Sequence, residues 1–420
     1  MARFFYTVLY ALLLPLFIAR LWWRGRVNPG YRQRISERFG WLPHRPAAHG
    51  VWVHAVSVGE ALAAAPYIKA MQQRYPDIPV IVTTTTPTGS EQVKRLFGSS
   101  VFHMFLPYDL PIFWTLFLRR IRPGLLVVME TELWPNLMAA CERRQLPVML
   151  ANARLSPKSA RGYAKFAALT RPMLQRLSLV AAQNASDGQR FIDLGLAENK
   201  LEITGSVKFD VDLPADVQRR GAALRAEWGA ERKVLALASS HAGEDEQLLA
   251  LYPQLQAACP DLLLLLIPRH PERFDAVSRA AKQAGLITRR RSAGSAGEQC
   301  QVYVADTMGE MLLLLAAADL VLMGGSLIEH GGHNPIEPAA LGKATLTGPH
   351  YMNFAAIVDQ LVAQQALAVV TPETLAGDLL RYLTAPELCR AMGQAGAEVV
   401  ADNRGAVQRL VGLSANLMQR

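Results

Sequence analysis

The sequence predicts an α/β protein of two doubly wound domains, each with a parallel sheet covered by helices on both faces. The chain has 420 residues, enough for two domains of ordinary size. Short apolar runs alternate with amphipathic stretches along its length, and these runs are continuously apolar. Strands buried on both faces have this pattern. Hydrophobic residues make up 51% and charged residues 19% of the chain, which excludes a disordered protein.

The first predicted element is an apolar N-terminal helix. Phe4–Ala19 carries no charge and is followed by Arg20, Trp22 and Trp23. A helix of this length spans ~24 Å, less than the ~30 Å hydrocarbon core of a bilayer. No small-residue cleavage site follows it, which disfavours a signal peptide. We expect residues 1–23 to form a membrane anchor, and both a spanning and an interfacial helix remain open.

Positive charge is concentrated beside this helix. The net charge is +9, and the first fifty residues contribute +7 because eight arginines face one acid, Glu37. These arginines are Arg3, Arg20, Arg24, Arg26, Arg32, Arg34, Arg38 and Arg45. A local basic segment favours contact with an anionic membrane surface over nucleic-acid binding. The excess of arginine after the apolar run predicts, by the positive-inside rule, that the bulk of the chain faces the cytoplasm.

Thirteen strands are predicted from the apolar runs. The first half holds Val51–Ser57, Val80–Thr84, Val101–Leu106, Leu125–Glu130, Val148–Ala151, Leu179–Ala182 and Leu201–Thr204. The second half holds Val234–Ala238, Leu262–Ile267, Val302–Ala305, Leu320–Met323, Thr345–Thr347 and Ala368–Val370. The polar stretch Phe209–Arg219 predicts the joint, giving domains over 24–210 and 211–420. The four cysteines have no disulfide or zinc spacing, and we expect all of them to be buried free thiols.

Ligands of parallel sheets bind beyond the carboxyl ends of strands, so the turns after the strands are the candidate sites. These turns contain neither GxGxxG nor GxxxxGK[ST], and we expect no dinucleotide or other cofactor. Ser57 and Glu60 follow the first strand with the spacing of a capping box. Glu60 could equally serve as a general base at the mouth of the domain. We expect the helix N-terminus to keep Glu60 ionised and weakly basic.

Two further turns of the first domain carry charged residues. Glu130 and Glu132 follow the fourth strand, with Trp134 and a Pro-started helix behind them. They are either dipole-favoured acids at a helix start or a polar cluster facing Glu60. Lys208 stands near the joint, and a lone lysine is usually a solvated surface charge.

The largest cluster of glycine and polar residues is in the second half of the chain. Gly324, Gly325 and Ser326 precede a stretch from Glu329 to Glu337, EHGGHNPIE. Asn334 fits an N-cap, Pro335 a first helical residue and Glu337 a capping box, so this helix start could receive a phosphate. His330 and His333 suggest a metal, but two histidines separated by loop glycines have no evident ligand geometry, and we expect no metal. Arg269 could bind an anion bidentately, and Met308-Gly309-Glu310-Met311 is predicted to open another helix.

These motifs together resemble the 3-deoxy-D-manno-octulosonic acid (Kdo) transferases of lipopolysaccharide synthesis. The resemblance rests on the N-terminal anchor and on SVGE, METELWPN, GSVKFD, PRHPERF, MGEM and GGSLIEHGGHNPIEPA, in this order. It implies the GT-B fold, two Rossmann-type domains with a cleft between them. It also implies an inverting transferase that moves Kdo from CMP-Kdo to a lipid A precursor (lipid IVA) at the cytoplasmic face of the bacterial inner membrane.

The resemblance also assigns roles to residues. The family's base matches Glu60, and its transition-state stabilisers match Glu130 and Lys208. Its CMP contacts match Pro268, Arg269, Gly309, Glu310, Met311, Asn334, Pro335, Ile336 and Glu337. Lys208, Arg269 and the helix N-termini would offset the charge of the departing CMP.

Two other interpretations of the function stay open. A sugar-nucleotide epimerase of the same fold would also use the Gly-rich loop, but it would not need the apolar segment flanked by Arg and Trp. A membrane-attached binding protein without catalysis would not need the Glu60 carboxylate. Release of CMP on mixing with donor and acceptor lipid would exclude it.

Overall fold

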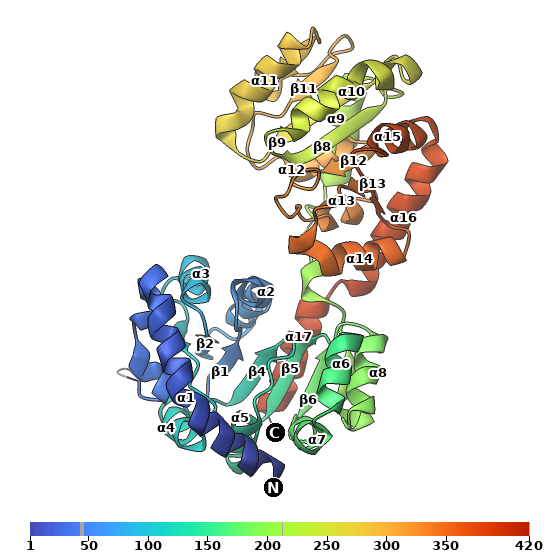
Figure 1. The fold of residues 1–420 in the computed structure, drawn as a ribbon. Coiled ribbons are helices and arrows are strands. Elements are labelled where there is room, and N and C mark those ends of the chain that lie inside the picture. The colour runs from blue at the N-terminus through green and yellow to red at the C-terminus, as the bar shows by residue number, and fades with distance from the viewer. Residues whose placement is uncertain (43–45, 212, 420) are drawn as a thin grey trace. The chain divides into compact units, whose positions relative to one another are not determined.

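The computed structural model describes residues 1–42, 46–211 and 213–419. Within this part the chain divides into two compact units, one made of residues 1–210 with 403–420 and one made of residues 211–402. Each contains one parallel sheet flanked by helices (Figure 1), so the predicted doubly wound architecture is confirmed. Arg45 of the basic segment and residue 212 of the expected joint lie outside the described residues.

The sheet of the first unit has seven parallel strands in the order β3-β2-β1-β4-β5-β6-β7. They are β1 (Val51–His54), β2 (Val80–Thr84), β3 (Phe102–Phe105), β4 (Leu125–Met129), β5 (Val148–Ala153), β6 (Leu179–Ala182) and β7 (Leu201–Ile203). The strand order reverses between β1 and β4, which pair with Val51 opposite Leu125. The turns after these two strands therefore flank the switch point, where open α/β sheets bind ligands.

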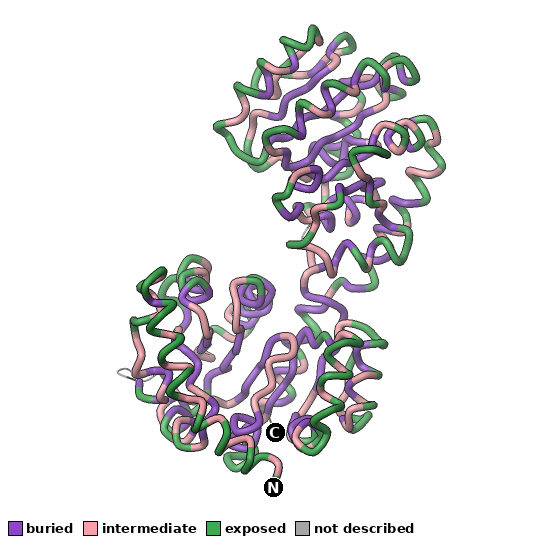
Figure 2. Tube along the Cα trace, in the orientation of Figure 1, coloured by how far each residue is buried: buried purple, intermediate pink, exposed green. Residues whose placement is uncertain are grey.

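Residues of each central strand alternate between two buried layers. Val51 and Val53 of β1 pack in the hydrophobic cluster that includes α2, whereas Trp52 packs in the cluster on the opposite face. Both faces are covered, which explains the continuously apolar runs (Figure 2). The helices of this unit are α1 (Ala2–Val27), α2 (Val58–Arg74), α3 (Pro87–Phe97), α4 (Pro111–Ile121), α5 (Pro135–Arg143), α6 (Pro157–Ala164), α7 (Ala167–Gln175), α8 (Ala185–Asp193) and α17 (Ala406–Met418).

The second unit repeats this design, with strands in the order β10-β11-β9-β8-β12-β13-β14. They are β8 (Val234–Ser240), β9 (Leu263–Pro268), β10 (Thr288–Arg290), β11 (Val302–Val304), β12 (Leu320–Met323), β13 (Ala344–Thr347) and β14 (Ala368–Val369). The order reverses between β8 and β12. Strand β10 was not among the predicted strands, because its Thr-Arg-Arg sequence at the sheet edge has no apolar run.

The helices of the second unit cover both faces of this sheet (Figure 1). They are α9 (Val217–Trp228), α10 (Glu244–Ala258), α11 (Phe274–Gln283), α12 (Met311–Ala317), α13 (Ile336–Ala340), α14 (Ala355–Ala363), α15 (Leu375–Thr384) and α16 (Pro386–Asn403). Three of the four cysteines are buried, but Cys389 is only half-buried, so the prediction of four buried thiols is wrong at that position.

The expectation that the second domain extends to residue 420 is also wrong. Helix α17 belongs to the first unit, among the blue and green elements of Figure 1. The Tyr67 hydroxyl on α2 lies 2.7 Å from Ser414 Oγ on α17. The Asp210 carboxylate accepts hydrogen bonds from the backbone N–H groups of Gly405 and Val407. The apolar face of α17 is thus buried on a helix far from it in the sequence.

Candidate active site

Glu60 lies in the first turn of α2, directly after β1. Its carboxylate accepts hydrogen bonds from the Val56 N–H (2.8 Å) and from the Ser57 hydroxyl (3.1 Å). The Glu60 N–H donates in turn to Ser57 Oγ at 3.4 Å. The predicted capping box forms only in part, because Ser57 accepts the Glu60 N–H but the Glu60 carboxylate binds the N–H of Val56 rather than that of Ser57. These hydrogen bonds fix the Glu60 side chain at the carboxyl edge of the sheet.

The protonation of Glu60 differs from the expectation. The pKa of Glu60 is raised to about 7: burial is the largest cause, the carboxylates of Glu130 and Glu132 add to it, and the hydrogen bonds from Val56 and Ser57 oppose it. We expected the helix N-terminus to dominate and keep the group weakly basic, and this is wrong because desolvation of the carboxylate is the larger effect. A carboxylate with a pKa near 7 suits general-base catalysis at neutral pH.

Glu130 follows β4, the strand beside β1. Its φ of 57° is in the left-handed region, which costs a non-glycine residue about 1–3 kcal/mol. Its carboxylate lies 3.4 Å from Lys208 Nζ, and both side chains are about one-third exposed. The structure thus gives Lys208 a specific partner, although the sequence offered no reason to see more than a surface charge there.

Asn152 is a residue that the sequence reasoning missed. It stands in β5 with φ 52°, and its side-chain oxygen accepts the Val207 N–H at 3.2 Å. Val207 begins the 3-10 turn Val207–Phe209 that carries Lys208. Asn152 therefore helps to position the lysine. The sequence could have identified Asn152, because it is a polar residue within an otherwise apolar strand.

In the second unit Pro268 ends β9 and Arg269 follows it. The Arg269 N–H donates to the Ser240 carbonyl at the end of β8 (3.1 Å). Its side chain is exposed, and among the described residues its guanidinium has no ion-pair partner. This leaves the guanidinium available to an anion.

Gly309, Glu310 and Met311 form the predicted helix start, since α12 begins at Met311. Gly309 has φ 82°, which favours glycine. The Glu310 carboxylate is bound by the Arg291 guanidinium at 2.9 Å, and this contact lowers its pKa. Arg291 thus holds Glu310 in its ionised form.

The Asn334–Glu337 helix start differs from the prediction. Helix α13 begins at Ile336, so Pro335 rather than Asn334 occupies the N-cap position. Asn334 Oδ1 still accepts the Ile336 N–H at 3.1 Å. Glu337 is half-buried, and burial raises its pKa rather than a capping box lowering it. The helix has five residues, too few for a substantial macrodipole.

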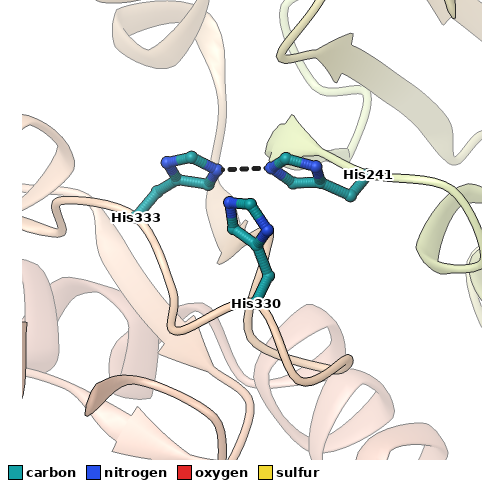
Figure 3. A group of neighbouring side chains, drawn as sticks. All are labelled: His241, His330 and His333. Carbon is teal, nitrogen blue, oxygen red and sulfur yellow. Dashed lines mark hydrogen bonds between the residues drawn. The ribbon is translucent and has the colours of Figure 1, made fainter. Parts of the chain in front are cut away.

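The two histidines of the Gly-rich loop do share a geometry, contrary to our expectation. Ring nitrogens of His330, His333 and His241 all lie within 4.8 Å of one another (Figure 3). His241 follows β8, a strand that the sequence reasoning did not connect with the loop after β12. The three imidazoles form the one set of possible metal ligands found in the described part of the chain.

Helix α1 carries apolar residues on both sides. It is long and apolar enough to cross a membrane, yet it lies against the first unit, with the Thr7 hydroxyl donating to Asn136 Oδ1 at 3.0 Å. Its half-buried residues recur with helical spacing and include Tyr6, Thr7, Tyr10, Leu13, Leu14, Phe17, Ile18 and Leu21. The remaining large apolar residues are exposed, among them Phe4, Phe5, Val8, Leu9, Leu12, Leu16, Trp22 and Trp23.

Known protein families match the sequence of both units. Residues 33–211 match the family described as 3-deoxy-D-manno-octulosonic-acid transferase (kdotransferase), and residues 246–399 match glycosyl transferases group 1. MurG of Acinetobacter baumannii has a similar fold, with 11% identity, a TM-score of 0.54 and coverage of 88% of this chain and 100% of that chain. The C-terminal CMP-Kdo binding domain of WaaA from the same organism is 34% identical, covers 49% of this chain and 100% of its own, and has a TM-score of 0.40.

Similarity also extends over the full length. The 3-deoxy-D-manno-octulosonic acid transferase of Haemophilus influenzae is 42% identical over 425 residues, which cover 100% of both chains. A Bordetella pertussis protein of the same name is 39% identical over 97% of this chain and 98% of its own. Because this similarity in sequence extends over both units, the chain belongs to the 3-deoxy-D-manno-octulosonic acid transferase family.

Proposed function

We propose that this protein transfers Kdo from CMP-Kdo to a hydroxyl group of a lipid A precursor, lipid IVA, with inversion at the anomeric carbon. The observation that carries the mechanism is Glu60, a buried carboxylate with a pKa of about 7 at the switch point of the first sheet. Membership of the Kdo transferase family supplies the reaction class. In this proposal the Gly-rich loop serves a transferase rather than an epimerase.

Glu60 acts as the general base. Its carboxylate removes the proton of the acceptor hydroxyl while the oxygen forms a bond to the anomeric carbon of Kdo. The bond from that carbon to the phosphate oxygen breaks, and CMP leaves with the electron pair. The Ser57 and Val56 hydrogen bonds hold the carboxylate in one orientation during this transfer.

Lys208 and Arg269 stabilise the negative charge that develops on the departing phosphate. Lys208 carries its charge beside Glu130, so the pair is close to neutral until an anion arrives. Arg269 directly follows β9, has an exposed guanidinium and acts on His333, the residue before the proposed CMP contacts at 334–337. Glu130 holds the lysine and also raises the pKa of the base.

Helix α1 is proposed to lie in the membrane interface rather than to cross the bilayer. One side of α1 packs on the first unit, and the Thr7–Asn136 hydrogen bond joins them, so that side is partly covered by protein. The other side exposes Phe5, Leu9, Leu12 and Trp23, which suit the acyl and headgroup boundary. Arg20, Arg24 and Arg26, which are exposed near the end of α1, would attract anionic lipid and the phosphates of the acceptor. The expected basic segment does not act as a whole, because Arg38 is buried and Arg34 is paired with Glu37.

The test is a transfer assay with the full-length purified protein, CMP-Kdo and tetraacyl lipid A precursor. Mass spectrometry of the lipid is expected to find the precursor heavier by one or more Kdo units, with release of CMP. Omission of the donor is the control. Donor breakdown without a Kdo-bearing lipid would contradict the proposed acceptor, and no donor turnover at all would contradict the transferase function.

A further inference from the structure

The three-histidine cluster (His241, His330 and His333) occupies the switch point of the second sheet. His241 follows β8, and the other two follow β12, its neighbour at the reversal of strand order. The Nε2 atoms of His241 and His333 are 2.8 Å apart, and the rings of His241 and His330 have centroids 3.9 Å apart (Figure 3). The roles assigned above leave these imidazoles unused, although they stand where a doubly wound domain binds its ligand.

The backbone beneath the cluster admits only small residues. A Cβ at Gly325 would stand 3.0 Å from His333 Cδ2 and 3.2 Å from His330 Cδ2, and Gly325 has φ 66°. A Cβ at Gly331, with φ 105°, would meet Asn353 Nδ2 at 2.3 Å. Glycine at 325 leaves room for the rings of His333 and His330, and glycine at 331 leaves room for Asn353.

The charges around the cluster are mainly positive. Groups that act on His241 or His333 are Glu244, Arg269, His270 and Arg273, together with the cluster histidines themselves. The one acid among them, Glu244, is buried and accepts four backbone N–H groups, those of His241, Gly325, Ser326 and Leu327. Arg273 is paired with Asp245 at 2.6 Å, which leaves Arg269 as an uncompensated cation.

This environment favours an anion over a metal ion. Histidines that bind metals almost always donate their second ring N–H to a carboxylate or carbonyl. Among the described residues no such acceptor is bonded to the three rings, whose one hydrogen bond joins His241 to His333. A divalent cation would also be repelled by Arg269, whereas an anionic oxygen would be attracted to it.

We propose that the three-histidine cluster binds an anionic group of the sugar-nucleotide donor, its phosphate or its sugar carboxylate, and takes up a proton when it does so. The identity of the donor rests on the proposed function. The imidazoles supply N–H donors, with Arg269 beside them as a permanent positive charge. The anion restores the proton that burial and neighbouring positive groups keep off His241 and His333.

The titration of the free cluster is consistent with this role. Burial, with the neighbouring histidines and Arg269, lowers the pKa of His333 to about 4, and burial likewise lowers the pKa of His241. Both rings are therefore neutral at pH 7 without ligand. A bound anion stabilises the imidazolium and raises these pKa values, so binding must strengthen as the pH falls. In the range where one proton is taken up, the affinity changes by up to about tenfold per pH unit.

The test is isothermal titration of the full-length protein with CMP and with cytidine, at pH 6 and pH 8 and in buffers of different ionisation enthalpy. His333→Gln should weaken CMP binding by about ten- to hundredfold and abolish the proton uptake, while cytidine affinity stays the same. Comparison with His333→Gln removes the titration of the CMP phosphate itself. His49→Asn, at an exposed histidine of the first unit with φ 62°, is the matched control and should change nothing.

Donor kinetics identify which anionic group is bound. If CMP affinity falls in His333→Gln, the cluster binds the phosphate. If CMP affinity is unchanged but the KM for CMP-Kdo rises with kcat maintained, it binds the sugar carboxylate. Either result supports an anion site. Unchanged CMP affinity together with an unchanged KM would overturn the proposal.

His330→Arg separates an anion from a metal. An added guanidinium should preserve or strengthen CMP binding, whereas it would destroy a three-histidine metal site. Tight zinc binding that His330→Arg abolishes, with weaker CMP binding in the same variant, would overturn the proposal in favour of a metal. Histidine-dependent CMP binding in a protein without Kdo transfer would refute the proposed function alone. Normal transfer with histidine-independent binding would refute this inference alone.

Discussion

Glu60 shows how one side chain can serve as a helix cap and still be tuned for chemistry. Its spacing from Ser57 predicted that the Ser57 hydroxyl accepts the Glu60 N–H, and the structure contains this hydrogen bond. The sequence could not predict the pKa, because the pKa depends on burial and on Glu130 and Glu132, which β4 brings beside β1. Similarly, His241 could not be linked to His330 and His333 until the strand order was known.

Glu130→Gln should shift the pH dependence of transfer. Glu130 raises the pKa of Glu60 because two nearby carboxylates disfavour the charged form of each other. Removal of its charge lowers the pKa of Glu60, so the base is ionised at lower pH and the acid limb of kcat against pH moves to lower pH. Lys208→Gln is the matched comparison, because it removes the other half of the ion pair without removing a carboxylate. An acid limb that stays in place in Glu130→Gln would disprove the coupling.

Elements were predictable wherever one local pattern determines them. The central strands were found because both of their faces are buried, which makes each run continuously apolar. Strand β10 has no such run and was missed. The start of α13 was misplaced by one residue, since Asn334 and Pro335 both fit a helix start and only the backbone decides between them.

Helix α1 should have both ends on the same side of the membrane. An interfacial helix leaves the N-terminus accessible from the side of the two units, whereas a spanning helix places it on the opposite side. Labelling of a single cysteine introduced at Ala2, in a variant without native cysteines, distinguishes the two in sealed vesicles. Protection of this cysteine from a reagent that reaches the two units would disprove the interfacial placement.

The exposed side of α1 should provide the attachment. Leu12→Glu with Leu16→Glu places charge on the lipid-facing side and should move the protein to the soluble fraction while both units stay folded. Arg24→Gln with Arg26→Gln should cause a smaller, salt-dependent loss, because each basic residue adds only ~1 kcal/mol near an anionic surface. Retention of the double glutamate variant on vesicles at high salt would mean that another surface attaches the protein.

At the scale of the whole molecule the sequence predicted two α/β units but not the return of the chain to the first. Tyr67 and Ser414 are in contact although they are 347 residues apart in the sequence, and no local sequence pattern predicts such a contact. The sequence analysis placed residues 406–418 in the second domain, because nothing local to them identifies α2 as their partner. Contacts that are distant in sequence therefore limited the prediction of both the domain boundary and the site.

Ser414→Ala should destabilise the first unit by about 1–3 kcal/mol. The substitution leaves the buried Tyr67 hydroxyl without its partner, and an unsatisfied buried polar group carries this cost. Ser159→Ala, at an exposed helix position whose hydroxyl accepts a hydrogen bond from Ser156, should change stability far less. Chemical unfolding followed by the fluorescence of first-unit tryptophans measures the difference. Equal stability of Ser414→Ala and the parent protein would show that the Tyr67–Ser414 hydrogen bond does not stabilise this unit.

The most direct test of the account is the turnover of Glu60→Gln, compared with the parent protein across pH with CMP-Kdo and the lipid A precursor. We expect parent activity to rise with pH through about 7, as the Glu60 carboxyl loses its proton and becomes able to accept one. Glu60→Gln should fold but lose about 10²–10⁴-fold in kcat, and it should also lose this pH dependence. A folded Glu60→Gln with near-normal kcat would contradict the account and leave Glu60 as a helix cap alone.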